Sequence, residues 1–208
     1  GKTTFIKLLC RLYDPQEGQI LLNGIDIRKY RYDDYMGIFS VVFQDFQLIC
    51  QPLGANVAGS MEYDRDRAKK ALIDAGFADR LAAMEKGLDT MLYKNLSEDG
   101  VEVSGGEAQK IVIARALYKD APFIILDEPT AALDPIAEAE IYSKFDEIAG
   151  NKTAIYISHR LSSCKFCDEI AVFHEGAVIQ QGSHTELLAD RGGKYYALWN
   201  AQAQYYTE

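Results

Sequence analysis

Gly1, Lys2, Thr3 and Thr4 lead directly into an apolar pattern with helical spacing, so a lysine and two hydroxyls stand at the start of a helix. The order G-K-[ST] is the second half of the phosphate-binding loop G-x-x-x-x-G-K-[ST]. Lys2 would neutralise the β- and γ-phosphates of a nucleotide, and Thr3 would offer its hydroxyl to Mg²⁺. The amides at the helix start, from Gly1 to Thr4, favour an anion because the helix dipole is positive there. An ordinary helix start could carry the same residues.

Three apolar strand patterns end on polar residues. Gln44 follows FSVVF, Asp127 and Glu128 follow FIIL, and His159 follows AIYIS. In an open parallel sheet, ligands bind at the carboxyl ends of the strands, so these side chains would converge on a phosphate and magnesium site. Asp127 would hold the Mg²⁺ of ATP through water, Glu128 would polarise the attacking water, Gln44 would contact both, and His159 would reach the γ-phosphate. Taken singly, a solvated turn or a structural histidine explains each of them.

The segment VSGGEAQK indicates a second anion site. Ser104 and Glu107 fit a capping box at a helix start. The capping box does not explain Gly105 and Gly106, since each glycine disfavours a helix by about 1 kcal/mol relative to alanine. Two glycines let a phosphate or another backbone approach closely. Two phosphate-binding helix starts in one chain indicate that ATP is bound between two molecules.

The elements that position these residues form an α/β pattern, in which apolar strands alternate with amphipathic helices. A hairpin is expected over 18–27, with Asn23 and Gly24 as its two-residue turn. Further strands are expected at 38–43, within 122–130, and at 153–159, 169–174 and 177–182. Helices are expected from the start to about 13, between about 60 and 90, and at 108–119, 135–149, 184–190 and 193–204.

Composition excludes some classes of protein. The net charge of −9 argues against a nucleic-acid partner, which would require a surplus of basic residues. No apolar run approaches the roughly 18 residues of a membrane span. Cys164 and Cys167 form one CxxC, which is either a redox pair, half of a metal site or a packing pair; packing is favoured because no second Cys/His pair is spaced for zinc. Free thiols favour a reducing compartment.

Six motifs in order make the sequence resemble the nucleotide-binding domain of ABC transporters, over essentially all 208 residues. GKTT resembles the end of the Walker A loop, VVFQD the Q-loop, FIILDEP the Walker B strand, AALD the D-loop and ISHR the H-loop. VSGGE resembles the LSGGQ signature, with Val103 for leucine and Glu107 for glutamine. We expect Glu107 to cap the helix backbone and to point away from the γ-phosphate. The resemblance implies a P-loop NTPase fold with a mainly parallel core sheet and an α-helical subdomain.

The resemblance also implies a mechanism. Two domains form a head-to-tail homo- or heterodimer with ATP and Mg²⁺ at the interface, and hydrolysis releases the two halves. One chain contributes Lys2, Thr3, Gln44, Asp127, Glu128 and His159, and its partner contributes Ser104, Gly105, Gly106 and Asp134. The chain is expected to be a single ABC ATPase domain over 1–208, with a helical subdomain at about 45–118 and a catalytic core at 1–44 and 119–208.

The subtype resembles that of exporters. SEDG (97–100) resembles an exporter element that would place Glu98 against the membrane domains, and the tail over 182–202 is similar to exporter tails. We therefore expect the ATPase domain of an exporter at the cytoplasmic face of the membrane, with its transmembrane domains fused upstream. The front half of the Walker A loop, the N-terminal strands and the adenine contact are expected upstream of Gly1, so this segment alone is expected to bind ATP poorly. The transported substrate stays open, and a soluble ABC ATPase or a degenerate, regulatory domain is the alternative.

Overall fold

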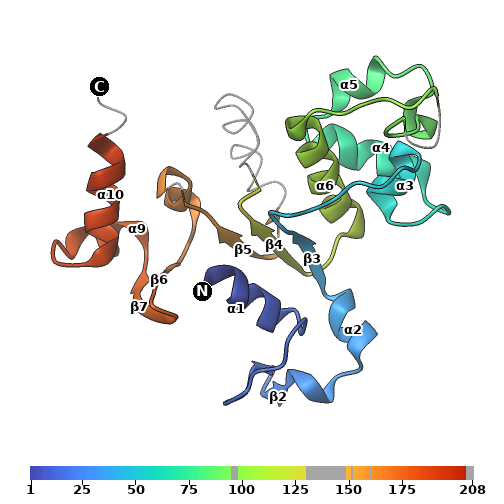
Figure 1. The fold of residues 1–208 in the computed structure, drawn as a ribbon. Helices are drawn as coiled ribbons and strands as arrows, with labels where there is room; N and C mark the ends of the chain where they lie inside the picture. Colours follow the sequence, from blue (N-terminus) through green and yellow to red (C-terminus); the bar gives the residue numbers. More distant parts are fainter. Residues whose placement is uncertain (95–97, 130–148, 151, 160, 205–208) are drawn as a thin grey trace. The chain divides into compact units, whose positions relative to one another are not determined.

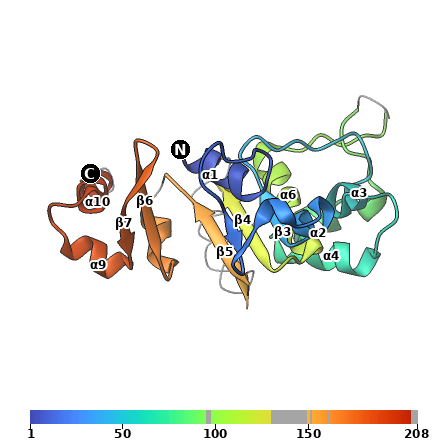
Figure 2. The same ribbon diagram turned by 90° about the horizontal axis from the view of Figure 1, so that it is seen from below.

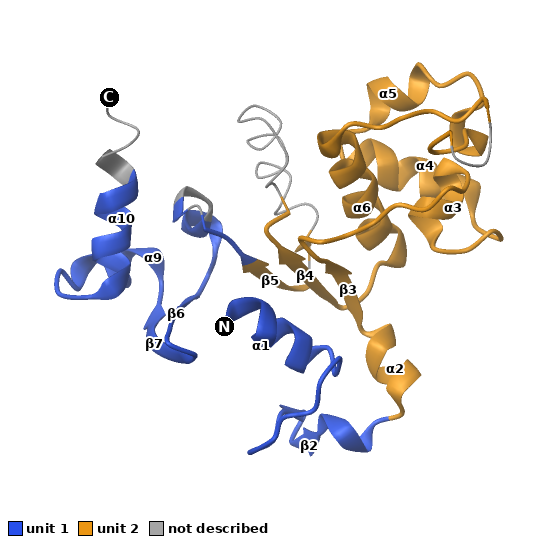
Figure 3. Ribbon diagram, viewed as in Figure 1, with its two compact units in different colours: residues 1–30, 157–208 blue, residues 31–156 orange. Residues whose placement is uncertain are grey.

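The computed structural model describes residues 1–94, 98–129, 149–150, 152–159 and 161–204. The chain divides into two compact units, which Figure 3 shows in different colours. Unit 1 combines Gly1–Tyr30 with Ile157–Glu208, and unit 2 covers Arg31–Tyr156. The expected boundaries at 44/45 and 118/119 stay predictions.

The sheet of unit 2 carries the apolar strands that the sequence predicts. Its strand order is β3 (Phe39–Val42), β4 (Phe123–Asp127) and β5 (Thr153–Ile157), which lie side by side in Figure 1 and Figure 2. β3 and β4 are parallel, in a register that pairs Val42 with Leu126. Most residues of β3 and β4 are buried, as expected for the centre of a parallel sheet.

The helices that the structure describes in unit 2 include one long helix, which packs against several of the others. They are α2 (Tyr32–Gly37), α3 (Leu53–Ala58), α4 (Arg65–Asp74), α5 (Ala78–Ala82) and α6 (Gly105–Lys119), with a short 3₁₀ turn, η2, at Gly87–Asp89. Val112 and Ala116 of α6 pack on β3 and β4, whereas Ile111 and Ala114 pack in the core formed with α3 and α4. α6 is therefore buried on two faces, which fixes both its position and its rotation.

Unit 1 begins with α1 (Lys2–Leu9), which ends earlier than the predicted Tyr13. Arg11 adopts a left-handed conformation, with φ of 52°. The amide of Arg11 then donates to the carbonyl of Leu8, and that of Leu12 donates to the carbonyl of Lys7. This is the Schellman arrangement, in which a non-glycine residue here takes the place usually held by glycine. The periodic apolar pattern continues past Leu9, but the helix ends there.

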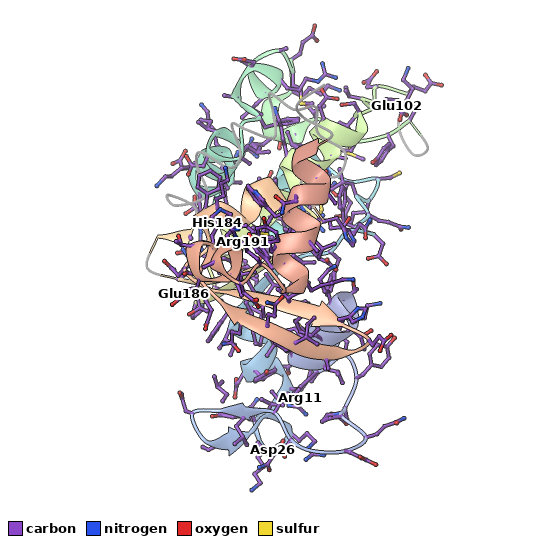
Figure 4. All side chains as sticks on the ribbon, turned by 90° about the vertical axis from the view of Figure 1, so that its left-hand side faces the viewer. Arg11, Asp26, Glu102, His184, Glu186 and Arg191 are labelled. Atoms are coloured by element: carbon purple, nitrogen blue, oxygen red, sulfur yellow. The ribbon has the colours of Figure 1, made fainter. Side chains whose placement is uncertain are left out.

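The predicted hairpin follows as β1 (Leu21–Leu22) and β2 (Ile25–Asp26), which are antiparallel. Asn23 and Gly24 have φ of 52° and 76°, as a type I′ turn requires, so the hairpin prediction is confirmed. A 3₁₀ turn, η1 (Ile27–Lys29), comes next, and the side chain of Asp26 accepts a hydrogen bond from the Arg28 amide at its start. Figure 4 labels Asp26.

The remaining elements of unit 1 are η3 (Leu161–Phe166), the antiparallel strands β6 (Ile170–His174) and β7 (Ala177–Gly182), and the helices α9 (His184–Ala189) and α10 (Lys194–Gln204). Ser183 and Glu186, the second of which is labelled in Figure 4, form a capping box that starts α9.

Cys164 and Cys167 pack against a core cluster of Ile170, Val172, Leu187 and Tyr195. Burial raises the pKa of the Cys167 thiol and raises that of Tyr195 to about 12. The packing interpretation of the CxxC is therefore confirmed.

Two predictions fall outside the described residues: Asp134, and all of the helix over 135–149 except its last residue. Among the described residues, no helix is both long and apolar enough to cross a membrane.

A buried amide holds the chain between β3 and α3. Asn56 is 1% exposed. Its Oδ1 accepts from the Ile49 amide at 3.0 Å, and its Nδ2 donates to the carbonyls of Ile49 and Gln51 at 2.9 and 3.1 Å. Arg115 of α6 donates to the carbonyl of Asn56 at 2.8 Å. The segment that follows Gln44 is thus tied to α6.

We predict that Asn56→Ala lowers the free energy of unfolding of unit 2 by about 1–3 kcal/mol, because it removes the hydrogen bonds of a buried side-chain amide and leaves the Ile49 amide without this acceptor. Urea unfolding measures the loss, and hydrogen exchange over 49–57 locates it. Glu62→Ala, at an exposed position, is the control and should stay within about 0.5 kcal/mol of wild type. Equal stability of the two variants would contradict this role of Asn56.

Candidate functional site

The end of the parallel pair β3–β4 brings three of the predicted residues together. Because Val42 pairs with Leu126, Asp127 closes β4 one residue further on, and Gln44 follows β3 by two residues. Gln44, Asp127 and Glu128 therefore lie at the same edge of the sheet, as predicted from the strand ends. Gln44 is exposed, Glu128 is partly buried and Asp127 is buried.

Asp127 is the most unusual group at this edge. It is 1% exposed, and among the described residues neither of its carboxylate oxygens has a hydrogen-bond partner. A buried carboxylate is costly when nothing around it compensates it. A cation at this position would remove that cost.

The donor set around Asp127 suits Mg²⁺ better than a transition metal. In the described part of the chain, no three His, Cys, Asp or Glu side chains gather as a metal-binding group. Mg²⁺ does not need such a group, since it keeps several waters and is held by one or two carboxylates together with substrate phosphates. Asp127 fits this pattern, and the contributions of Thr3 and Gln44 stay predictions.

The backbone of Glu128 has a conformation that residues other than glycine usually avoid. Its φ is 50°, in the left-handed region, which costs roughly 1–2 kcal/mol for a residue with a Cβ. Pro129, which follows it, itself disfavours helical conformations in the preceding residue. Such conformations persist where the surroundings enforce them, and they concentrate at functional sites. The carbonyl of Glu128 accepts a hydrogen bond of 3.3 Å from Nε2 of Gln109 on α6.

The predicted capping box at the start of α6 is confirmed. Ser104 is the N-cap residue, and its Oγ accepts from the Glu107 amide at 3.2 Å. Glu107 Oε2 accepts from the Ser104 amide at 2.7 Å. The Ser104 oxygen accepts this bond, and no acceptor among the described residues takes its proton, which stays available for an anion.

An arginine that the sequence analysis did not single out neutralises Glu107. Nε of Arg80, on α5, lies 2.8 Å from Glu107 Oε1. The carboxylate that replaces the glutamine of the family signature is thus engaged by a helix amide and by a cation. The pair is 27 positions apart, and no local pattern connects the two residues.

The start of α1 offers bare amides. Gly1 occupies the N-cap position and has no side chain for capping, and the first turn holds no acidic residue. The first amides of a helix have no acceptor within the helix, so those of Lys2, Thr3 and Thr4 point out of its end. Lys2 is partly buried, and Thr3 and Thr4 are exposed.

His159 is exposed just after β5, and a glutamine from α10 braces its backbone. Nε2 of Gln202 donates to the carbonyl of His159 at 2.6 Å, and its Oε1 accepts from the Leu161 amide at 2.9 Å. Gln202 was not predicted, because 43 positions separate it from His159. Glu98, the expected contact with membrane domains, is exposed in a turn.

These elements and motifs define a P-loop NTPase of the ABC type. A sequence family described as ABC transporter matches residues 1–131, and the chain belongs to this family. The predicted family and fold class are therefore confirmed.

Relatives of the chain are named as flippases. The chain is 41% identical over 204 residues to the ATP-dependent lipid A-core flippase of Burkholderia orbicola (strain AU 1054), a match that covers 98% of this chain and 34% of that protein. It is also 41% identical over 194 residues to the flippase of the same name from Pectobacterium atrosepticum, covering 92% of this chain and 33% of that protein. The chain thus spans about a third of the length of these relatives.

A solved structure matches the fold closely. The structure of a bacterial Atm1-family ABC exporter with ATP bound superimposes with a TM-score of 0.89 at 37% identity. The match covers 98% of this chain and 35% of that chain.

We predict that Asp127→Asn stabilises the nucleotide-free protein by about 1–2 kcal/mol, because an uncharged amide is less costly to bury than an unpartnered carboxylate. Thermal unfolding in a metal chelator measures the gain. Asp14→Asn, in an exposed loop, is the matched control and should leave stability within about 0.5 kcal/mol. Destabilisation by Asp127→Asn would mean that the carboxylate is compensated without a ligand.

Proposed function

We propose that the chain is the ATP-binding and ATP-hydrolysing motor domain of an ABC exporter. The observation that carries the proposal is the buried carboxylate of Asp127, which has no hydrogen-bond partner among the described residues. It lies beside Glu128, at the sheet edge that Gln44 shares. A carboxylate buried in this way suits a cation that arrives with a ligand. The relatives supply the setting, because their names describe ATP-dependent flippases and an exporter.

In this proposal, different residues of the chain have different roles in binding and hydrolysing ATP. Lys2 and the amides from Gly1 to Thr4 bind the phosphates, and His159 contacts the γ-phosphate. Thr3, Gln44 and Asp127 hold Mg²⁺, which when bound draws charge from the phosphates and lowers the barrier to their cleavage. Glu128 orients and polarises the attacking water, a role that needs its carboxylate held in one direction.

A second copy, or a related chain, completes the site. Ser104, Gly105 and Gly106 would present the free end of α6 to the γ-phosphate of the nucleotide bound by the partner, with Asp134 beside them. Ser104 still has its proton to donate, and Arg80 offsets the charge of Glu107, so the end of α6 stays receptive to an anion. Because ATP favours the joined dimer, dimer formation must favour ATP binding by the same coupling energy.

Transmembrane domains in the same polypeptide are the proposed partners, and the cytoplasmic face of the membrane is the proposed location. The flippase relatives favour a lipid-like amphiphile as the transported substrate. The solved structure with a similar domain belongs to an exporter of another family, the Atm1 family. The complete protein, reconstituted in vesicles with a fluorescent lipid, tests the transport step. ATP hydrolysis in an assembly without membrane domains would favour a soluble ABC ATPase instead.

We predict that Glu128→Gln in the complete protein lowers ATP turnover by at least about a hundredfold, because it removes the proposed base. ATP-driven approach of the two motor domains should persist, since phosphate binding does not need this carboxylate. Phosphate release measures turnover, and spin-label distances between the two domains measure their approach. Turnover near that of the wild type would remove Glu128 from this role.

We also predict that Arg80→Ala weakens ATP binding about two- to fivefold at low salt, because it leaves the charge of Glu107 unscreened near the proposed phosphate site. Adding Glu107→Gln should restore the affinity. Lys86→Ala, which breaks the ion pair with Asp99, is the matched control and should change nothing. If Glu107→Gln alone bound ATP several-fold more tightly than the wild type, Arg80 would not be neutralising the Glu107 carboxylate.

A further inference from the structure

Gln109 is a buried polar side chain to which the roles proposed above assign no function. It lies on α6, five residues after Ser104, and is 2% exposed. Its Nε2 donates to the carbonyl of Glu128 at 3.3 Å, across 19 positions of sequence. Burying an amide among apolar neighbours is unfavourable unless its hydrogen bonds are made, so the contact with Glu128 is part of what keeps Gln109 there.

The acceptor of this bond is the residue with the least favourable backbone at the site. Glu128 has φ of 50° and is followed by Pro129. Rotation of the Glu128 backbone toward an extended conformation would turn its carbonyl and its side chain together. A donor fixed on a helix that is itself packed on two faces opposes that rotation.

We propose that Gln109 is a positioning residue that holds Glu128 in its left-handed conformation and so directs the Glu128 carboxylate toward the water it polarises. The proposal rests on the proposed function, since it assigns Gln109 a task in the hydrolysis carried out by Glu128. In this role Gln109 acts through Glu128 and needs no contact of its own with nucleotide or water.

The placement of Gln109 has a further consequence. Ser104 and Gln109 lie on the same rigid helix, about 7.5 Å apart along its axis. In a head-to-tail dimer, Ser104 contacts the nucleotide of one site, while Glu128 of the same chain serves the other site. Gln109 therefore links the end of α6 that meets one nucleotide to the residue that acts on the second nucleotide.

The test uses Gln109→Met in the complete protein, because methionine has a similar length and fills the same space without a donor. We expect kcat for ATP hydrolysis to fall about tenfold, while KM for ATP and the affinity for a non-hydrolysable analogue stay within about twofold. Lys110→Met, at the adjacent position on α6, is the matched control and should keep kcat within about twofold. A residue with only a structural role would instead change stability and affinity together.

A double-mutant cycle sharpens the result. In the Glu128→Gln background, Gln109→Met should not lower the residual turnover further, because its effect passes through the carboxylate that is already removed. Should Gln109→Met fold poorly, Gln109→Asn keeps the amide but is one methylene too short to reach the carbonyl, and the same fall in kcat is expected.

Three outcomes would overturn the proposal: an unchanged kcat, a loss confined to KM, or an equal further loss in the Glu128→Gln background. These are distinct from a failure of the proposed function. A wild-type protein that hydrolyses ATP, with a Glu128→Gln variant that does not, keeps the motor function whatever Gln109→Met does. A wild-type protein without hydrolysis would remove both proposals.

Discussion

The burial of α6 on two faces is the constraint on which the rest of unit 2 depends. Val112 and Ala116 pack on the sheet, while Ile111 and Ala114 pack among α3 and α4. A protein interior is close-packed, so a rotation or a slide of the helix would open voids or cause clashes in both contacts. The two contacts together therefore fix the helix. Its first turn is therefore presented in one direction, and its buried glutamine reaches one point at the end of β4. The position of the signature segment relative to Glu128 follows from this packing.

Three buried polar side chains of unit 2 differ in how they are satisfied, and the difference separates structure from chemistry. Asn56 satisfies its amide with backbone groups of the segment after β3, which is a structural use of a polar core residue. Gln109 donates to the strained backbone of Glu128. Asp127 has no partner for either oxygen among the described residues. A buried carboxylate without a partner is costly and a bound cation would remove that cost, which is why this residue marks the proposed site most clearly.

The departure of this chain from the family signature is compensated locally. The carboxylate of Glu107 would place a negative charge beside a site for phosphate, where the family has a neutral glutamine. One of its oxygens caps the helix and the other lies against Arg80. The helix start therefore combines a stronger cap with a neutralised charge. A substitution that looks unfavourable in the motif is thus part of a three-residue arrangement.

The sequence by itself determined the local structure and the family. Asn23 and Gly24 specify their turn because only certain residues adopt positive φ easily, and Ser104 with Glu107 specifies a helix start within four residues. The apolar runs before Gln44 and Asp127 identify strands, and parallel pairing then requires their ends to meet at one edge.

Only the tertiary structure decided the end of α1 at Leu9 and the contacts of Gln109, Arg80 and Gln202. It also left Asp127 without a hydrogen-bond partner among the described residues. Each of these contacts joins residues at least 19 positions apart. The physical reason is that periodicity and capping encode interactions within a few residues. A long-range contact depends on how whole elements pack, and no pattern within a short segment records that.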